Sequence, residues 1–211
     1  MFLNAHSWFS LRYGILRPEE VLAQAQAAGV TCMALTDVHC TAGGPDFARL
    51  APKYDIRPVL GIDFRNGATQ RFIGIARDHD GYEKLCDFLS ELIQTNPTGK
   101  PLQIPNRAPA LEGVIWVYPW ALRTESSPPW QRPGALRDDE CLGVRPEDLG
   151  DLRLALQRDP EDSPFNRMIA LHSTSFRHKR DHNTHRLLRA IDNNTLLSKL
   201  PDNQVAPITD R

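Results

Sequence analysis

The sequence predicts a single α/β domain, and two observations carry this prediction. Short apolar segments typical of buried strands alternate along the chain with amphipathic segments of helical period. The length of 211 residues, 41% of them hydrophobic, suffices for one substantial core. Such alternation favours a largely parallel sheet, arranged either as a barrel or as an open sheet.

In the first half, residues 18–28 are predicted to form a helix. Pro18 suits the first turn, Glu19 and Glu20 complement the positive helix N-terminus, and Gly29 can end the helix in a left-handed conformation. Apolar or alternating runs predict strands, and apolar residues at helical spacing predict the helices between them. The expected order is a strand at 30–35, a helix at about 46–54, strands at 57–64 and 71–76, and a helix at 80–93.

The second half repeats this order after a proline-rich interruption. Strands are expected at 114–118, 141–144 and 168–172, with helices at about 146–156 and 181–191. Between residues 94 and 110 a proline occurs at every fourth position, which forbids a regular helix and favours an extended surface segment. Residues 124–140 form a second long loop. The strand and helix pattern resumes after each loop, so neither is interpreted as a domain linker.

Composition excludes several classes of protein. The 25 Lys and Arg residues nearly balance the 26 Asp and Glu residues, so no overall field points to nucleic acid or to a membrane surface. The four cysteines form no CxxC pair and are interpreted as free thiols in a reducing compartment. With neither a signal-peptide pattern nor a membrane span, we expect a cytoplasmic protein without a membrane partner.

Three polar residues fall where predicted strands end, namely His6, Asp37 and Asp63. Chemistry in a parallel α/β barrel gathers at the carboxyl ends of the strands. One imidazole and two carboxylates could therefore hold a divalent cation with open positions for water and a phosphate ester. The alternative is that each residue only caps the turn or helix that follows.

A family resemblance extends this interpretation. The segments 4–14, 34–37 and 58–64 resemble the first motifs of the polymerase and histidinol phosphatase (PHP) domain, in particular that of the alpha subunit of bacterial DNA polymerase III. Residues 75–85 and 185–196 are similar to later parts of the same domain. The resemblance implies a distorted (β/α)7-type barrel in a single domain, residues 1–200. It also implies a tail, residues 201–211, leading toward a polymerase body.

Compared with that family, the metal site has lost most of its ligands. The opening His-x-His is Asn4-Ala5-His6, and an acidic residue is replaced by Tyr13. The Thr-Asp-His element keeps Asp37 but has Val38 in place of the histidine, with His39 one position late.

The later motifs are changed in the same way. The Glu of the third motif is Asp63, a His-Pro element is Tyr118-Pro119, and the late Asp-x-His aligns with Ser173-Thr174-Ser175. Amide, phenol, valine and hydroxyl groups are poor substitutes for imidazole and carboxylate. No metal is therefore expected, and His6, Asp37 and Asp63 are weak candidates at most. The acids are expected to accept hydrogen bonds instead, in a network suited to Asn4 and Tyr13.

Two other groups of residues outside these motifs could form sites. His39 would need a bulge to reach the same centre, and His172 is interpreted as a strand residue. The basic stretch at 177–189 could hold phosphate groups through Arg177, Lys179, Arg180 and Arg186. The alternative for this stretch is a solvated helix face, which we favour.

These observations lead to two hypotheses. The first is a catalytically inactive PHP domain at the N-terminus of a DNA polymerase III alpha subunit, with a structural or docking role in replication. Its partners would be the rest of that chain, DNA through that chain and a proofreading exonuclease, and the nucleotidyltransferase activity would belong to the whole polymerase. The second is a free-standing phosphoesterase that uses Mn or Zn at His6, Asp37 and Asp63. A histidinol-phosphatase-like enzyme is disfavoured by the same missing ligands.

Overall fold

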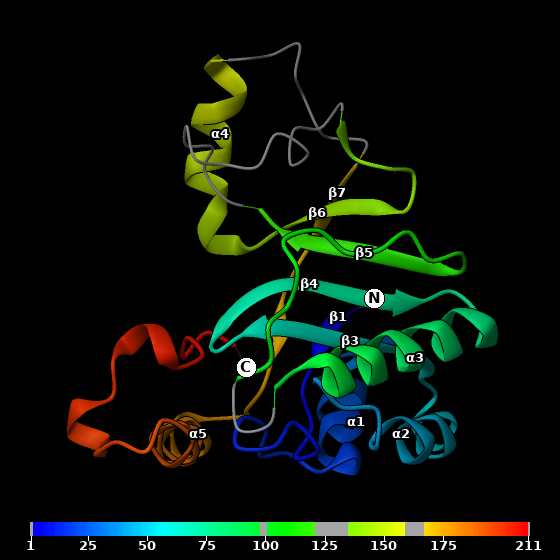
Figure 1. Ribbon diagram of the computed structural model, residues 1–211. Coiled ribbons are helices and arrows are strands. Elements are labelled where there is room, and N and C mark those ends of the chain that lie inside the picture. The colour runs from blue at the N-terminus through cyan, green and yellow to red at the C-terminus, as the bar shows by residue number, and fades with distance from the viewer. Residues whose placement is uncertain (1, 98–100, 121–134, 159–166, 211) are drawn as a thin grey trace.

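One curled sheet forms the centre of the protein (Figure 1). The structure is a computed structural model and describes residues 2–97, 101–120, 135–158 and 167–210. Its eight strands follow the spatial order β7-β6-β5-β4-β3-β2-β1-β8. They are β1 (Phe2–Ala5), β2 (Cys32–Val38), β3 (Arg57–Asn66), β4 (Thr69–Ala76), β5 (Val114–Pro119), β6 (Glu140–Val144), β7 (Met168–Ala170) and β8 (Ser173–Thr174).

The sheet is largely parallel, as the sequence predicts. Only β4 runs antiparallel to its neighbours β3 and β5, and the remaining pairs are parallel. The reversal has a local cause, because β3 and β4 are joined by a tight turn in which Gly67 has a φ of 61°. The carboxyl ends of the parallel strands therefore meet at one end of the sheet, together with the start of β4.

The segment 168–174 closes the sheet into a distorted barrel. Its first residues pair with β6, where Gly143 is opposite Ile169, and its last residues pair with β1, where Asn4 is opposite Ser173. The single strand predicted at 168–172 is therefore observed as two short strands, Met168–Ala170 and Ser173–Thr174, separated by Leu171 and His172. A cluster drawn from strands on opposite sides fills the interior, with Ile73, Ile75, Val117 and Leu171 at its centre.

The helices cover the outside of the sheet. In Figure 1, α1 and α2 lie together beside β1, α3 runs across β3 and β4, and α4 lies at the β6 end of the molecule. The helical elements are α1 (Pro18–Ala27), α2 (Gly44–Leu50), η1 (Ala51–Tyr54), α3 (His79–Thr95), η4 (Pro146–Asp148), α4 (Leu149–Arg158), α5 (Lys179–Asp192), η6 (Leu197–Lys199) and η7 (Asp202–Gln204).

Local signals explain the helix ends. Glu20 accepts a hydrogen bond from the Arg17 N–H at 2.9 Å, and Gly29 follows α1 with a φ of 70°. In α3 the Asp78 carboxylate accepts a hydrogen bond from the Gly81 N–H at 2.8 Å. Within the described ranges, no helix combines the length and the apolar character needed to cross a bilayer.

Two expectations are corrected by the structure. The strand expected at 30–35 lies at Cys32–Val38, because Val30 still bonds back to α1 through Ala25 O. Residues 101–110 of the proline-rich segment are irregular, as predicted, but they are more than a surface loop. Ile104 and Ala108 are buried against the aromatic cluster under α3. Residues 124–134 of the second loop lie outside the described residues.

Candidate functional site

The polar side chains predicted from the strand ends gather at one end of the barrel. We call them the strand-end cluster. Its members come from β1, from the turn after it and from the ends of β2, β3 and β8. All of them are buried except His39, which is half-buried. They are Asn4, His6, Tyr13, Asp37, His39, Asp63, Ser173 and Ser175.

The first and last motifs meet through the pairing of β1 with β8. Asn4 Nδ2 donates to Ser173 Oγ at 2.8 Å, and Thr36 Oγ1 donates to Asn4 Oδ1 at 2.8 Å. Two positions further along each segment, His6 Nδ1 lies 2.9 Å from Ser175 Oγ. Amide and hydroxyl groups thus hydrogen-bond directly to one another across this strand pair.

His6 also joins β1 to β3. Its Nε2 lies 3.0 Å from Asp63 Oδ2, and both side chains are fully buried. An ionised carboxylate oxygen can only accept, so Nε2 carries a proton. If the ring is neutral, Nδ1 accepts the hydrogen bond from Ser175. The imidazole therefore acts as a bridge between two protein groups.

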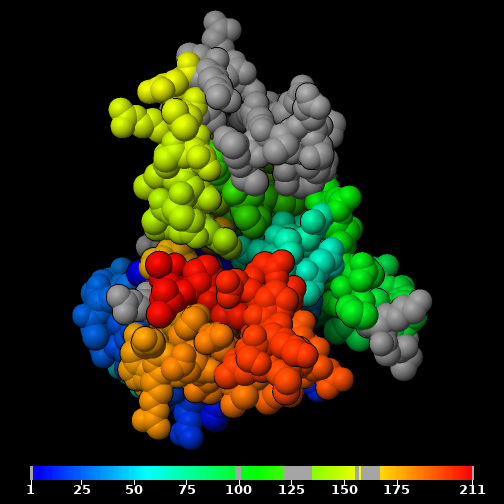
Figure 2. Space-filling model, turned by 90° about the vertical axis from the view of Figure 1, so that its left-hand side faces the viewer, coloured from blue at the N-terminus to red at the C-terminus, as the bar shows by residue number. Residues whose placement is uncertain are grey.

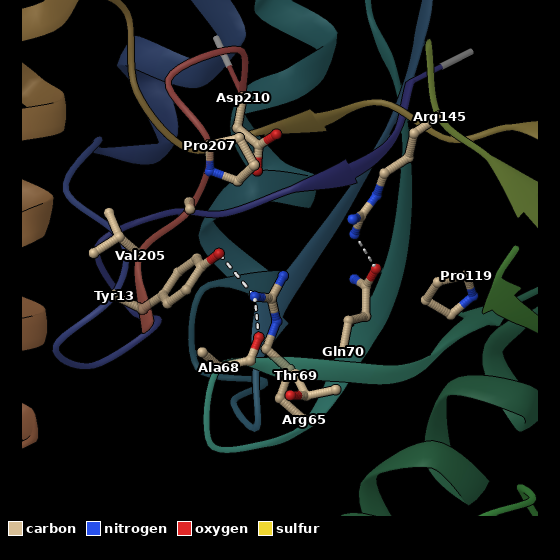
Figure 3. A pocket seen from close by; sticks show the side chains of 11 residues that line it. Tyr13, Arg65, Ala68, Thr69, Gln70, Pro119, Arg145, Val205, Pro207 and Asp210 are labelled. Carbon is tan, nitrogen blue, oxygen red and sulfur yellow. Dashed lines mark hydrogen bonds between the residues drawn. The ribbon is translucent and has the colours of Figure 1, made fainter. Parts of the chain in front are cut away.

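Arg65, which was not among the predicted site residues, provides the positive charge of the cluster (Figure 3). Its Nη2 and Nε lie 2.7 and 2.8 Å from Asp63 Oδ2, and its Nη1 donates to the Tyr13 hydroxyl at 2.8 Å. Burial alone would raise the pKa of Asp63, but the charge of Arg65 and the hydrogen bond from His6 outweigh it. The pKa of this carboxyl is held well below its usual range.

Asp37 belongs to a separate set of hydrogen bonds formed by the turn after β1. Its Oδ1 accepts from the Ser7 N–H at 2.6 Å and from Ser10 Oγ at 2.7 Å, and its Oδ2 accepts from Ser7 Oγ at 2.7 Å. Three donors on two oxygens leave this acid engaged in holding the turn against β2. Both strand-end acids accept hydrogen bonds, as the sequence predicts.

The His39 ring bonds to the backbone of β3, and among the described residues it forms no hydrogen bond with the side chain of His6 or Asp63. Its backbone is left-handed, with a φ of 48°, and its Nε2 accepts a hydrogen bond from the Arg65 N–H at 2.8 Å. Burial lowers the pKa of this histidine. The displaced histidine thus secures the end of β3. His172 packs near Phe2, with ring centroids 5.7 Å apart.

Tyr118 faces the opposite side of the sheet from the strand-end cluster. Its hydroxyl donates to Glu140 Oε1 at 3.0 Å and accepts from the Ala108 N–H at 3.0 Å, within the layer under α3. Burial raises the pKa of Tyr118. Of this Tyr-Pro pair, Pro119 is among the residues that line a pocket beside the strand-end cluster, and Tyr118 is not.

Sequence reasoning missed Arg65, Gln70 and Arg145. Gln70 Nε2 donates to Asp63 Oδ2 at 2.8 Å, and Arg145 Nη2 donates to Gln70 Oε1 at 2.8 Å. Signals for two of them were present. Arg65 is two positions after Asp63 on the same strand and so faces the same side, and Arg145 directly follows β6. Gln70 is opposite Arg65 in the β3–β4 pair, which depends on the turn between them.

The C-terminal residues pack over this end of the barrel. Asp210 O accepts from the Ser175 N–H at 2.9 Å, and the Ala206 N–H donates to His185 Nε2 at 3.0 Å. His185 Nδ1 in turn donates to Tyr13 O at 2.7 Å, and burial lowers the pKa of His185 to about 4. Figure 2 shows these C-terminal residues, in red, between α4 and α5 on one face of the molecule.

Part of the predicted basic stretch is already paired within the protein. Arg177 Nη1 lies 2.8 Å from Glu20 Oε1, and its Nε lies 3.1 Å from Asp181 Oδ2. Lys179 and Arg180 are exposed at the start of α5, whereas Arg186 is half-buried. The acid Asp181 occupies the first turn of α5, where an anion would otherwise be attracted.

The residues present do not fit a cluster of cations. Across the parts of the chain that the structure describes, no three His, Cys, Asp or Glu side chains gather in an arrangement that could hold a metal ion. Both ring nitrogens of His6 and both oxygens of Asp37 have protein partners. Within the strand-end cluster, Asp63 Oδ1 is the one buried side-chain atom without a hydrogen-bond partner among the described residues, and a guanidinium lies beside it.

The fold and this end of the barrel define a class: an α/β barrel whose strand-end cluster is joined by internal hydrogen bonds and one buried ion pair. Comparison with known families gives a more specific assignment. The PHP domain family matches residues 3–112, and the chain belongs to this family.

Curated relatives connect the chain with DNA polymerases. An error-prone DNA polymerase of Mycobacterium bovis is 34% identical over 110 residues, which are 47% of this chain and 10% of that protein. The corresponding protein of Ralstonia nicotianae is 32% identical over 103 residues, 46% of this chain and 10% of that protein. A DNA polymerase III subunit alpha of Buchnera aphidicola is 26% identical over 98 residues, 44% of this chain and 8% of that protein. The chain thus matches a tenth or less of these relatives, and its resemblance to polymerase PHP domains is confirmed.

Two solved structures are loosely similar. An amidohydrolase from Chromobacterium violaceum, described with bound sulfate and no metal, has a TM-score of 0.48 and 16% identity over 83% of this chain and 86% of that one. A Bifidobacterium adolescentis protein described as a metal-dependent phosphoesterase has a TM-score of 0.38 and 12% identity, over 92% of this chain and 84% of that one. With TM-scores below 0.5, neither likeness bears on the function of this chain.

Proposed function

We propose that this chain is a catalytically silent PHP domain of a bacterial DNA polymerase III alpha-type chain, with a structural role in that polymerase. The observation that carries the proposal is the ion pair between Asp63 and Arg65, 2.7 Å long and almost fully buried. A guanidinium on the chain supplies the positive charge that a bound cation would otherwise bring to this carboxylate.

Electrostatics supports the absence of a metal. A divalent cation at the free Asp63 Oδ1 would lie beside the Arg65 guanidinium, and their repulsion would be little screened in a buried site. Metal-assisted hydrolysis requires an open coordination position that generates a nucleophilic water, and the donors for such a site are engaged elsewhere. This chemistry favours a domain retained for its shape and contacts.

The experiment is elemental analysis after gentle purification, with a phosphate-ester assay in the presence of added manganese or zinc. We expect less than one tightly held transition metal per chain and negligible hydrolysis. Two or three metals per chain would overturn the proposal. So would hydrolysis that disappears in His6→Ala and in Asp63→Ala but persists in Arg153→Ala, an exposed residue on α4.

The second candidate, a phosphoesterase with a reduced metal site, is favoured by one observation. Asp63 Oδ1 is a buried acceptor without a partner among the described residues, next to His6. A single cation would satisfy it if Arg65 moved aside. Metal-dependent activity that increases in Arg65→Ala would favour this candidate.

The partners follow from the polymerase relatives. We propose that the remainder of a polymerase chain packs on this domain, that DNA is bound through that chain, and that a proofreading exonuclease docks nearby. A cytoplasmic location is consistent with the four free cysteines. The reading frame around the coding region tests the first point, and co-purification with the exonuclease subunit tests the last. A coding region without polymerase motifs would contradict the assignment.

A further inference from the structure

A pocket of about 320 Å³ opens beside the strand-end cluster (Figure 3). Tyr13 and Arg65 line one side, Gln70 and Arg145 another, and Asp210 closes it from the C-terminal segment. Ligand pockets start at about 300 Å³, so this one is suited to a small molecule or to a single chemical group. The two guanidinium groups come from β3 and from the residue after β6, far apart in the sequence.

The two arginines differ in how far their charges are neutralised. Arg65 gives two of its donors to Asp63 and one to Tyr13. Arg145 has the neutral amide oxygen of Gln70 as a partner, and among the described residues it forms no ion pair. Its Nε is buried and lacks a hydrogen-bond partner in the same part of the chain. Leaving a buried donor of a charged group without a hydrogen bond costs free energy, so an acceptor bound at Arg145 would be stabilising.

The Asp210 side chain places a carboxyl group in the pocket but forms no hydrogen bond with the arginines that line it. The Asp210 backbone is held by the Ser175 N–H, and its side chain lines the cavity that Arg65 and Arg145 also line. Among the described residues, no side chain forms a hydrogen bond or an ion pair with the Asp210 carboxyl. The acid thus contributes charge to the pocket but does not use the donors of Arg145.

We propose that this pocket binds a small oxyanion group, held by Arg145 with Gln70 and Arg65, and that Asp210 competes with it. The charge balance supports an anion: Asp63 neutralises Arg65, and the Arg145 guanidinium is left for a ligand once Asp210 is displaced. Guanidinium groups recognise carboxylate and phosphate oxygens equally well by geometry. The proposal does not depend on whether the domain is catalytically silent.

The test is calorimetric titration of the purified chain with inorganic phosphate and, in a second series, with acetate, at low ionic strength and at pH 8. This pH lies above the pKa of about 7 to which burial raises the Asp210 carboxyl, so the competing charge is present. The variants are Asp210→Asn, Arg145→Gln, Arg145→Lys and the matched control Arg153→Gln, an exposed arginine on α4. Thermal melting of each variant establishes that it is folded. Asp210→Asn keeps the shape of the side chain and removes the competing charge.

We expect Asp210→Asn to bind phosphate several-fold more tightly than the parent chain and Arg145→Gln to lose roughly tenfold or more in affinity. Arg145→Lys should retain part of the binding, and Arg153→Gln should leave it unchanged. Preference for phosphate would identify a phosphate-type ligand, and equal binding of acetate would extend the site to carboxylates. Binding that does not change in Arg145→Gln, or no binding in folded Asp210→Asn, would overturn the proposal.

Discussion

Arg65 Nη2 lies 2.7 Å from Asp63 Oδ2 in the interior of the barrel end, where both side chains are almost completely shielded from solvent. Two residues on one strand thus form a complete ion pair at the position where the family resemblance implies a metal. The positive charge is part of the polypeptide and depends on no ion from solution.

Replacing Arg65 by Met should destabilise the fold by about 3–5 kcal/mol, because it leaves the Asp63 carboxylate buried without its cation. Urea unfolding measures this. Breaking the exposed pair between Arg49 and Asp46 with Arg49→Met should cost less than about 1 kcal/mol and is the matched control. The double variant Arg65→Met, Asp63→Leu should recover much of the loss. Purely additive losses would argue against the coupling.

The Asp210 carboxyl should make the protein less stable as the pH rises. Burial raises its pKa to about 7, only partly offset by Arg145 and Arg65, from an ordinary value of 3.8. The folded state therefore binds more protons than the unfolded state between about pH 4 and 7, so this contribution to stability is lost across that interval. Asp210→Asn should melt at a higher temperature than the parent chain at pH 8 and at nearly the same temperature at pH 4. An equal difference at both pH values would contradict this account.

His185 should remain neutral until well into the acidic range. Its Nδ1 donates to Tyr13 O and its Nε2 accepts from the Ala206 N–H, an arrangement that only the neutral ring allows. Because the pKa is lowered to about 4, the stability that this ring contributes is present above its ordinary value of 6.5 and is lost as the pH falls toward 4. An NMR titration should give a midpoint near 4, with the Ala206 amide shifting together with the ring. A midpoint near 6.5 would mean that the C-terminal segment is not held by this histidine.

Metal binding should be recoverable only if the internal cation is removed. Restoring family ligands with Asn4→His, Ser173→Asp and Ser175→His places donors on the paired strands β1 and β8. We expect this triple variant to take up zinc measurably only when Arg65→Ala is added, since the guanidinium otherwise holds Asp63. Zinc titration with a competing chelator is the measurement. Equal uptake with and without Arg65 would show that missing donors alone explain the loss.

Local patterns were sufficient for most of the fold. Apolar runs and helical periods predicted β2 to β7 and α1 to α5 in their observed order, because period and capping depend on residues close together in the sequence. The expectation that polar residues after parallel strands meet at one end of the sheet likewise predicted that His6, Asp37 and Asp63 lie together. The short strand Ser173–Thr174 was not predicted, since two residues are too few to show the alternating pattern of a β-strand.

The sequence by itself determined which residue types are missing from the metal motifs and that the remaining acids must find other partners. The tertiary structure alone decided what those partners are. Arg145 reaches Gln70 across 75 positions, His185 reaches Tyr13 across 172, and the backbone of His39 turns its ring toward the end of β3. Such contacts depend on how β1, β3, β6 and the C-terminal segment pack together. That packing is set by the closure of the whole barrel, and the hydrophobic periodicity of the sequence does not predict it.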